Sequence, residues 1–384
     1  MIDLSVNKLH EGMITAQSIY NSTGASYLTR GTQLNRQYIE RLKKIGISKV
    51  HVTSLDPTIR ILPPNDIVSE QTRVTAIHRV FSAFQDIEKF DSFNLEALNS
   101  VSHSIVQDLL SQRDNLVQLT DIRLHDDYTF SHSVNVSILA SMLGSLCGLD
   151  KKDLLKLTLG GLLHDIGKLI VPSTILNKST SLNDKEMEII RMHPTAGREK
   201  LLSLKTPVSP DLLDITVQHH EHLDGNGYPA QLKGGQIHYF SRIIAIADVY
   251  DALTSERSYK RAYKPYTAYK IMTKCSNGQF DEDLLQLFFN NVALYPIGTI
   301  LKTKFGYAIV KKVNFGRTST PIICVFADEN ARVLEHVYDI DLASYPHDAI
   351  ECAIENYVTA QQSSVLKKRS QYCILKGINI SYAS

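Results

Sequence analysis

Apolar side chains recur at intervals of three and four residues from residue 67 to about residue 294, and this pattern restricts the fold more than any other feature. It begins at Val74, Ile77 and Val80 and continues past Leu143. Such spacing collects apolar groups on one face of an α-helix, whereas a half-buried strand needs strict alternation. We therefore predict a mainly α-helical protein built around an all-helical central domain.

The two ends of the chain have a different pattern. Residues 1–60 place short extended stretches around turn residues, followed by NRQYIERLKKIGISKVHV, which predicts a helix, a stop at Gly46 and a strand. After Tyr295–Pro296, β-forming residues alternate with Gly, Asp and Asn turns. The segment DPTIRILPPND carries three prolines and predicts a linker. We predict a small N-terminal α/β domain at 1–60, a linker and leading helices at 61–118, the main helical domain at 119–295, and a small β-rich C-terminal module and tail at 296–384.

Composition excludes several classes of function. The formal net charge of +1 gives no general attraction for nucleic acid, and no apolar run approaches the ~20 residues of a membrane helix. The first residues lack the basic and then apolar order of a secretory signal. The five cysteines form no CxxC pair, so neither a zinc knuckle nor a disulfide framework is indicated. We expect a cytoplasmic protein without a membrane span or a nucleic acid polymer as partner.

Histidines gather in the helical middle: eight of the 14 lie between His125 and His238. Within GLLHDIGKLIVP, His164 and Asp165 are adjacent in apolar surroundings, where unpaired ionisable groups are costly. Consecutive helical side chains diverge by about 100°, so both reach one site only at their shared edge. Lys168, four residues after His164, lies on the same helical face and can meet an anion.

The string VQHHEHLDGNGYP is harder to explain by packing. His219, His220 and His222 point in several directions, whereas a helix buries a single stripe. A solvated loop is the simple alternative. His132, at the head of an apolar helix, and His193, before a proline, are weak signals when taken singly, because such histidines are usually satisfied core or capping residues.

Two aspartates occupy the apolar helix SRIIAIADVYDALTSERSYKR. Asp248 lies among isoleucines and alanines, so we expect it to bind a metal ion. For Asp251, a cap or an ion pair with Arg257 or Arg261 is an adequate interpretation.

These groups supply five imidazoles and two carboxylates without a thiolate, a set that suits iron or manganese better than structural zinc. Seven ligands exceed the needs of one ion and match two divalent ions that share a bridging carboxylate.

The strings LLHDIGK, MHPTAG, HHEHLDGNGYP and ADVYDALTSERSYK resemble the signature series of the HD-GYP domain, a subgroup of the HD phosphohydrolases, over roughly residues 100–295. The resemblance implies an all-helical domain with two or three metal ions that hydrolyses the bacterial second messenger cyclic di-GMP to linear pGpG and, in some members, to GMP. It implies a catalytic bridge at Asp165, a phosphate-contacting group at Lys168, and metal ligands at His132, His164, Asp165, His193, His219, His220 and Asp248. We expect substrate contacts from Lys168, Asp224, Gly227, Tyr228, Pro229 and Arg257.

One position departs from part of the family. The pattern of three-metal members of the family has a glutamate four residues before the first histidine. This chain has Tyr128 at that position. A phenol is a poor replacement for a carboxylate at neutral pH. We therefore predict two ions, and a reaction that stops or slows at pGpG.

The flanking segments resemble modules that accompany the domain elsewhere, and we assign no activity to either; sensing and dimer contacts stay open. The GYP loop, Gly227–Tyr228–Pro229, is implicated by the resemblance in contacts with diguanylate cyclase (GGDEF) proteins. Three alternatives remain: hydrolysis of 3′,3′-cyclic GMP-AMP, a di-iron oxygenase of the HD type, and a binding module that uses the GYP loop. Lys168 and the GYP string argue against the oxygenase.

Overall fold

The computed structural model describes residues 2–20, 26–47, 49–52, 67–111, 128–176, 178, 180–255, 262–275, 278–345 and 349–353. These residues form two compact units. One unit contains the described residues from 67 to 289, and the other contains those before 53 and after 289. The predicted linker at 56–66 lies outside the described residues, and so do residues 354–384 of the predicted C-terminal module and tail.

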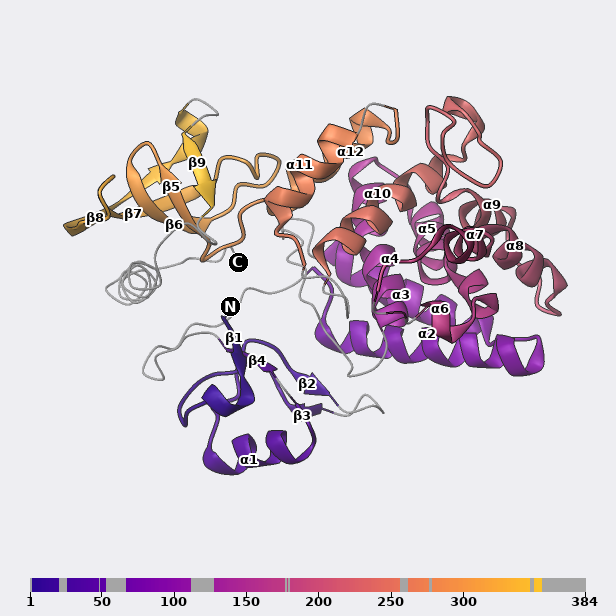
Figure 1. Cartoon of the computed structure of the whole chain (residues 1–384), viewed down its shortest axis with the longest axis horizontal. Helices are drawn as coiled ribbons and strands as arrows, with labels where there is room; N and C mark the ends of the chain where they lie inside the picture. Colours follow the sequence, from indigo (N-terminus) through magenta and orange to yellow (C-terminus); the bar gives the residue numbers. More distant parts are fainter. Residues whose placement is uncertain are drawn as a thin grey trace. The chain divides into compact units, whose positions relative to one another are not determined.

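The first unit is helical, as the spacing of apolar residues predicts. Helix α4 lies at its centre and contacts α2, α3, α5 and α10 (Figure 1). The helices are α2 (Glu70–Phe90), α3 (Leu95–Ser111), α4 (Tyr128–Leu146), α5 (Lys151–Leu163), α6 (Ser173–Leu176), α7 (Asp184–Arg191), α8 (His193–Ser203), α9 (Pro210–Gln218), α10 (Tyr239–Thr254), α11 (Pro265–Cys275) and α12 (Glu282–Asn291), with 3₁₀ helices η2 (Ile166–Ile170) and η3 (Gly234–Gln236).

Local sequence explains where several of these helices begin. The side chains of Ser69, Asp150, Asn183 and Ser209 each accept a hydrogen bond from a backbone N–H in the first turn of the helix that follows. Capping of this kind satisfies donors that have no partner inside the helix. The polar residues before the apolar runs therefore determine the ends, and the apolar faces determine the packing.

The α4–α5 contact is unusually close and brings two parts of the site together. A Cβ on Gly161 would lie 2.5 Å from the Cα of Ser137, so only glycine allows this approach. The Ser137 hydroxyl donates to the Thr158 carbonyl at 2.8 Å, and the Ser141 and Thr158 hydroxyls lie 2.7 Å apart. Small and hydroxyl side chains thus let the helices carrying His132 and His164 touch along their backbones.

Helices α2 and α3 belong to the same unit as the histidine-bearing helices. Phe130 on α4 lies edge-on to Phe81 and Phe84 of α2, with ring centroids 5.2 and 5.4 Å away. Edge-to-face aromatic pairs of this kind add to the stabilisation from buried area. The apolar face of α2 is therefore part of the core around α4.

The second unit contains strands from both ends of the chain. In the N-terminal part, β1 (Ile2–Ser5) pairs antiparallel with β4 (Lys49–Val52), and β2 (Ile19–Tyr20) with β3 (Ser26–Leu28). Helix α1 (Arg36–Lys44) covers an apolar cluster that includes Leu34 and Leu42. Short 3₁₀ helices are η1 (Val6–Lys8) and η4 (Leu342–Ser344).

The predicted β-rich character of the C-terminal module is confirmed. Five antiparallel strands pair in the order β8-β7-β6-β5-β9. They are β5 (Ile300–Thr303), β6 (Gly306–Lys312), β7 (Ile322–Ala327), β8 (Val333–Asp341) and β9 (Ile350–Ala353). In the described residues, no helix combines the length and apolar character needed to cross a membrane.

Candidate metal centre

The buried carboxylate of Asp165 lies at the centre of the histidine cluster. Its Oδ2 is 3.3 Å from His164 Nε2 and 3.7 Å from His132 Nε2. Its Oδ1 is 3.3 Å from His193 Nε2 and 3.8 Å from His219 Nε2. The two oxygens therefore face two different groups of imidazoles, which is the arrangement that a bridging carboxylate requires.

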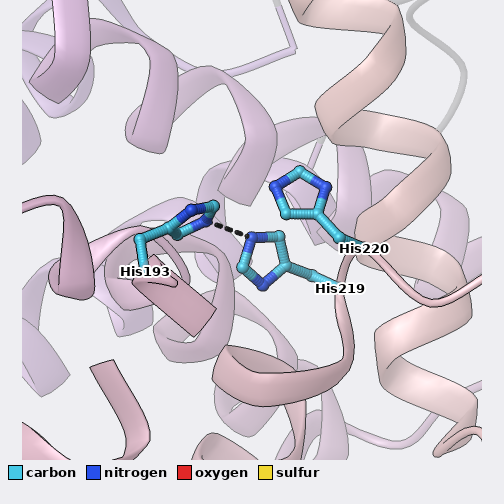
Figure 2. A group of neighbouring side chains, drawn as sticks. All are labelled: His193, His219 and His220. Carbon is cyan, nitrogen blue, oxygen red and sulfur yellow. Dashed lines mark hydrogen bonds between the residues drawn. The ribbon is translucent and has the colours of Figure 1, made fainter. Parts of the chain in front are cut away.

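Each group has the dimensions of a metal-binding set. Potential ligand atoms of His132, His164 and Asp165 lie within 4.8 Å of one another, as do those of His193, His219 and His220. Figure 2 shows the second set, in which His193 comes from α8 and the other two histidines follow α9.

Asp248 on α10 connects the two groups from the other side. Its Oδ1 is 3.0 Å from His132 Nε2, and its Oδ2 is 3.8 Å from His220 Nδ1. The structure thus brings together all seven residues that the sequence suggested as ligands.

Hydrogen bonds fix how the histidine rings point. The Nδ1 atoms of His164, His193 and His219 lie 2.8, 2.7 and 2.9 Å from the carbonyl oxygens of Gly161, Ile190 and Thr216. A carbonyl only accepts, so each Nδ1 carries the proton and each Nε2 presents a lone pair to the cluster. Metal-bound histidines are usually held in this way.

The unsatisfied atoms at the centre test whether a metal ion fits. His164 Nε2 and Asp165 Oδ1 are buried and make no hydrogen bond to any described residue. Buried acceptors without donors are costly, and several acceptors converging on one point disfavour each other. Divalent cations satisfy such a set, so the residues present fit a metal centre of nitrogen and oxygen ligands.

The HD pair does not lie within one helix, contrary to the sequence interpretation. Helix α5 ends at Leu163, His164 is its C-cap, and the 3₁₀ helix η2 starts at Ile166. At this junction the two adjacent side chains face one centre without the 100° rotation that separates neighbours in a continuous α-helix.

Close contact of two backbones places His193 beside Asp165. A Cβ on Gly167 would lie 1.8 Å from the carbonyl oxygen of His193 and 2.6 Å from the Gly197 nitrogen. Helix α7 ends at Arg191 and α8 starts at His193, with Pro194 in its first turn. The proline that makes His193 a weak sequence signal is thus well placed, because proline is tolerated where a helix begins.

Asp251 has a role that sequence reasoning missed. Its Oδ2 lies 2.7 Å from His132 Nδ1, and its Oδ1 accepts hydrogen bonds from Asn135 Nδ2 and Ser255 Oγ at 2.9 and 3.1 Å. These are the partners described for Asp251, whereas Arg257 and Arg261 lie outside the described residues. The available signal was the spacing of Asp251 three residues after Asp248 on a buried helix.

The electrostatic environment keeps Asp165, His219 and His220 in the states that bind cations, whereas His132 holds a proton. Burial opposes ionisation of Asp165, but the nearby His164 and Lys168 hold the pKa of its carboxyl well below the usual range. Burial and adjacent imidazoles lower the pKa of His219, and burial lowers that of His220 to about 3. Burial alone would lower the pKa of His132, but hydrogen bonds with Asp248 and Asp251 raise it to about 9. Asp248 and Asp251 therefore stabilise a proton on His132, and a cation that binds there displaces this proton.

Lys168 lies at the edge of the cluster. Its Nζ donates to Asp165 Oδ2 at 2.5 Å, and its side chain is partly exposed. It is thus paired with the central carboxylate, where the sequence interpretation left it free for phosphate.

The GYP loop folds back on the HHEH segment. The buried Glu221 carboxylate accepts hydrogen bonds from the Ala230 and Leu232 nitrogens at 2.6 and 3.0 Å. Tyr228 stacks on His220, with ring centroids 4.8 Å apart, and the Arg191 guanidinium lies 5.4 Å from the centre of the Tyr228 ring. The loop therefore borders the second histidine group.

Three predicted positions lie away from the ligand cluster or outside the described residues. The Asp224 carboxylate accepts from the Asn226 backbone and side chain at 2.8 and 2.9 Å, which closes a turn of the loop. Arg257 falls in 256–261, outside the described residues, and the same holds for the side chain of Tyr128, the first residue of α4.

The fold and the cluster define a helical protein with a buried histidine–aspartate centre suited to divalent cations. Residues 105–284 match the HD domain family. A curated cyclic di-GMP phosphodiesterase of Pseudomonas aeruginosa is 34% identical over 255 residues, which are 66% of this chain and 61% of that protein. A curated 3′3′-cGAMP-specific phosphodiesterase of Vibrio cholerae is 35% identical over 50% of this chain and 43% of that protein.

A solved structure supports the fold. An HDG"Y"P protein from Bdellovibrio bacteriovorus aligns with a TM-score of 0.51 and 20% identity over 75% of this chain and 98% of that one. The chain spans less than two thirds of the length of the two curated relatives. The HD domain match covers residues 105–284, and the GYP string inside it resembles that of HD-GYP proteins.

Proposed function

We propose that this protein is a metal-dependent phosphodiesterase that hydrolyses cyclic di-GMP to linear pGpG and so lowers the level of this bacterial second messenger. The observation that carries the proposal is the Asp165 carboxylate, whose two oxygens face separate histidine groups. The Pseudomonas relative, named a cyclic di-GMP phosphodiesterase, supports the substrate class.

We propose two divalent ions, iron or manganese, held by the seven residues of the cluster. His132 and His164 would hold one ion, and His193, His219 and His220 would hold the other, with Asp165 and Asp248 contributing carboxylates between the two groups. When bound, two such ions supply Lewis-acid stabilisation of phosphoryl oxygens and an activated water for in-line attack.

The chain's own residues orient the substrate. In this proposal Lys168 turns from Asp165 to a phosphoryl oxygen, and its charge offsets the charge that develops there. Tyr228 and Pro229 form the rim, with Gly227 and Asp224 shaping the loop and Arg257 as a further substrate contact. Burial raises the pKa of the Tyr228 phenol, so it stays a neutral hydrogen-bond donor beside the site.

Tyr128 limits the product. A neutral phenol at this position does not replace the carboxylate that a third ion needs. We therefore propose that the reaction stops or slows at pGpG rather than continuing to GMP.

The second candidate is hydrolysis of 3′,3′-cyclic GMP-AMP, and the specific support is the Vibrio cholerae relative named for that activity. The site chemistry acts on the phosphodiester and is the same for both dinucleotides. Contacts of the GYP loop with diguanylate cyclases remain a prediction from the family resemblance, and a homodimer and a cytoplasmic location remain predictions from the sequence.

The test is product analysis with both dinucleotides on full-length protein loaded anaerobically with Fe²⁺ or with Mn²⁺. We expect cyclic di-GMP to give pGpG, and the His164→Ala, Asp165→Ala double variant to give no turnover. His238→Ala is the matched control, because His238 lies in the same unit and pairs with Asp211. Full activity of the double variant, or faster turnover of cyclic GMP-AMP, would contradict the proposal.

A further inference from the structure

Helix α2 carries an arginine that is as deeply buried as the residues of the metal centre. The Arg73 side chain is 1% exposed, and its Nη1 donates a hydrogen bond to Asn135 Oδ1 on α4 at 3.1 Å. Burying a guanidinium is costly unless its hydrogen bonds serve specific partners. Arg73 lies before residues 105–284, the stretch that matches the HD domain family.

Asn135 connects this arginine to the ligand set. A guanidinium only donates, so the amide oxygen of Asn135 must face Arg73 and its amide nitrogen must face away. That nitrogen donates to Asp251 Oδ1 at 2.9 Å, and Asp251 Oδ2 lies 2.7 Å from His132 Nδ1. A continuous set of hydrogen bonds therefore connects Arg73 through Asn135 and Asp251 to His132, and Asp251 accepts from both Asn135 and His132.

The packing of α2 on α4 does not depend on these hydrogen bonds alone. Phe81 and Phe84 of α2 pack against Phe130 of α4 in the same helix contact. A simple anchoring role would be served by such apolar contacts, which do not set the orientation of any ring in the site. The set of hydrogen bonds instead ends on the nitrogen of His132 opposite the one that faces Asp248 and Asp165.

We propose that Arg73 is a positioning residue for the metal centre, acting through Asn135 and Asp251 to hold His132 with Nε2 toward Asp165 and Asp248. The proposal rests on the proposed function only in taking His132 as a metal ligand. Partners behind a ligating histidine orient its ring, and their loss typically weakens metal binding about 10- to 100-fold.

The experiment measures Mn²⁺ affinity by chelator competition on metal-free full-length protein, without a dinucleotide. Arg73→Met keeps most of the buried volume but removes the donor. We expect it to weaken one of the two Mn²⁺ sites about tenfold and to leave the other unchanged. Arg73→Lys keeps a charged donor, so we expect it to lose less Mn²⁺ affinity than Arg73→Met.

Controls separate positioning from stability. Val80→Ala removes fully buried apolar volume from the same helix, so it should lower the melting temperature without changing Mn²⁺ affinity. If Arg73→Met does not fold, Asn135→Leu carries the test, since it breaks both hydrogen bonds of the amide. Wild-type affinity in the folded Arg73 or Asn135 variant would overturn the proposal, as would an equal loss of affinity in Val80→Ala.

Failure of the proposed function can be distinguished from failure of the positioning role. A wild-type protein that binds two Mn²⁺ ions but hydrolyses neither dinucleotide would refute the function and leave the positioning role supported by the affinities.

Discussion

The Nε2 atoms of His193 and His219 lie 3.1 Å apart, although each ring uses its Nδ1 proton for a backbone carbonyl (Figure 2). Two unprotonated nitrogens at this distance present lone pairs to each other. Such a pair is favourable in a buried site when a cation accepts both, and this leads to the first prediction.

Metal removal should destabilise the protein. We expect the melting temperature of chelator-treated protein to rise on addition of Mn²⁺, and saturation at 100 times the dissociation constant corresponds to about 2.7 kcal/mol. The measurement is a thermal melt of the full chain with and without the ion. The His164→Ala, Asp165→Ala variant should show little rise, and an unchanged wild-type melting temperature would contradict a metal centre here.

Lys168 should contribute to turnover rather than to metal binding. In Lys168→Met we expect kcat/KM for cyclic di-GMP to fall about 100-fold, the scale reported for loss of one donor to a developing oxyanion. Metal content, measured by elemental analysis, should stay at the wild-type value. Lys178→Met is the control, because Lys178 pairs with Glu186. A wild-type kcat/KM in Lys168→Met would show that the ammonium serves Asp165 alone.

Gly167 should not tolerate a side chain. Gly167→Ala places a methyl group against the His193 carbonyl, so α8 must move away from η2 and carry His193 with it. We expect a loss of about 1–3 kcal/mol in the free energy of unfolding, together with weaker Mn²⁺ binding. Gly235→Ala is a suitable comparison, since a Cβ there meets nothing within 4 Å. Equal stability of the two variants, measured by urea unfolding, would contradict the close approach.

Glu221 should hold the GYP loop in place. Glu221→Ala leaves the nitrogens of Ala230 and Leu232 without their carboxylate acceptor, so we expect the loop to loosen and the KM for cyclic di-GMP to rise more than kcat falls. Glu221→Gln keeps one acceptor oxygen, so its KM should lie between those of the wild type and the alanine variant. Steady-state kinetics make the comparison, and identical KM values in all three proteins would refute the role.

The helical periodicity and the histidine-rich strings were sufficient to predict a helical domain with a metal site, and the resemblance to HD-GYP domains named the seven residues that the structure brings together. They sufficed because an imidazole or carboxylate in an apolar helix has few stable surroundings other than a partner or a metal ion. The β-rich character of the C-terminal module was also predicted, because β-forming residues alternate with turn residues there.

Other relationships depended on tertiary structure. The break between α5 and η2, where His164 and Asp165 face one centre, lies between two close approaches, of Gly161 to α4 and of Gly167 to α8. The function of Asp251 was hidden because its partner His132 lies 119 residues earlier in the chain.

Arg73 was hidden for the same reason. It resembles any arginine in an amphipathic helix until α2 is placed against α4 and the guanidinium meets Asn135. The sequence by itself determined which groups require partners, because burial of charge is costly wherever it occurs. Only the tertiary structure decided which groups are those partners, because hydrogen bonds between distant residues depend on distances that no local pattern encodes.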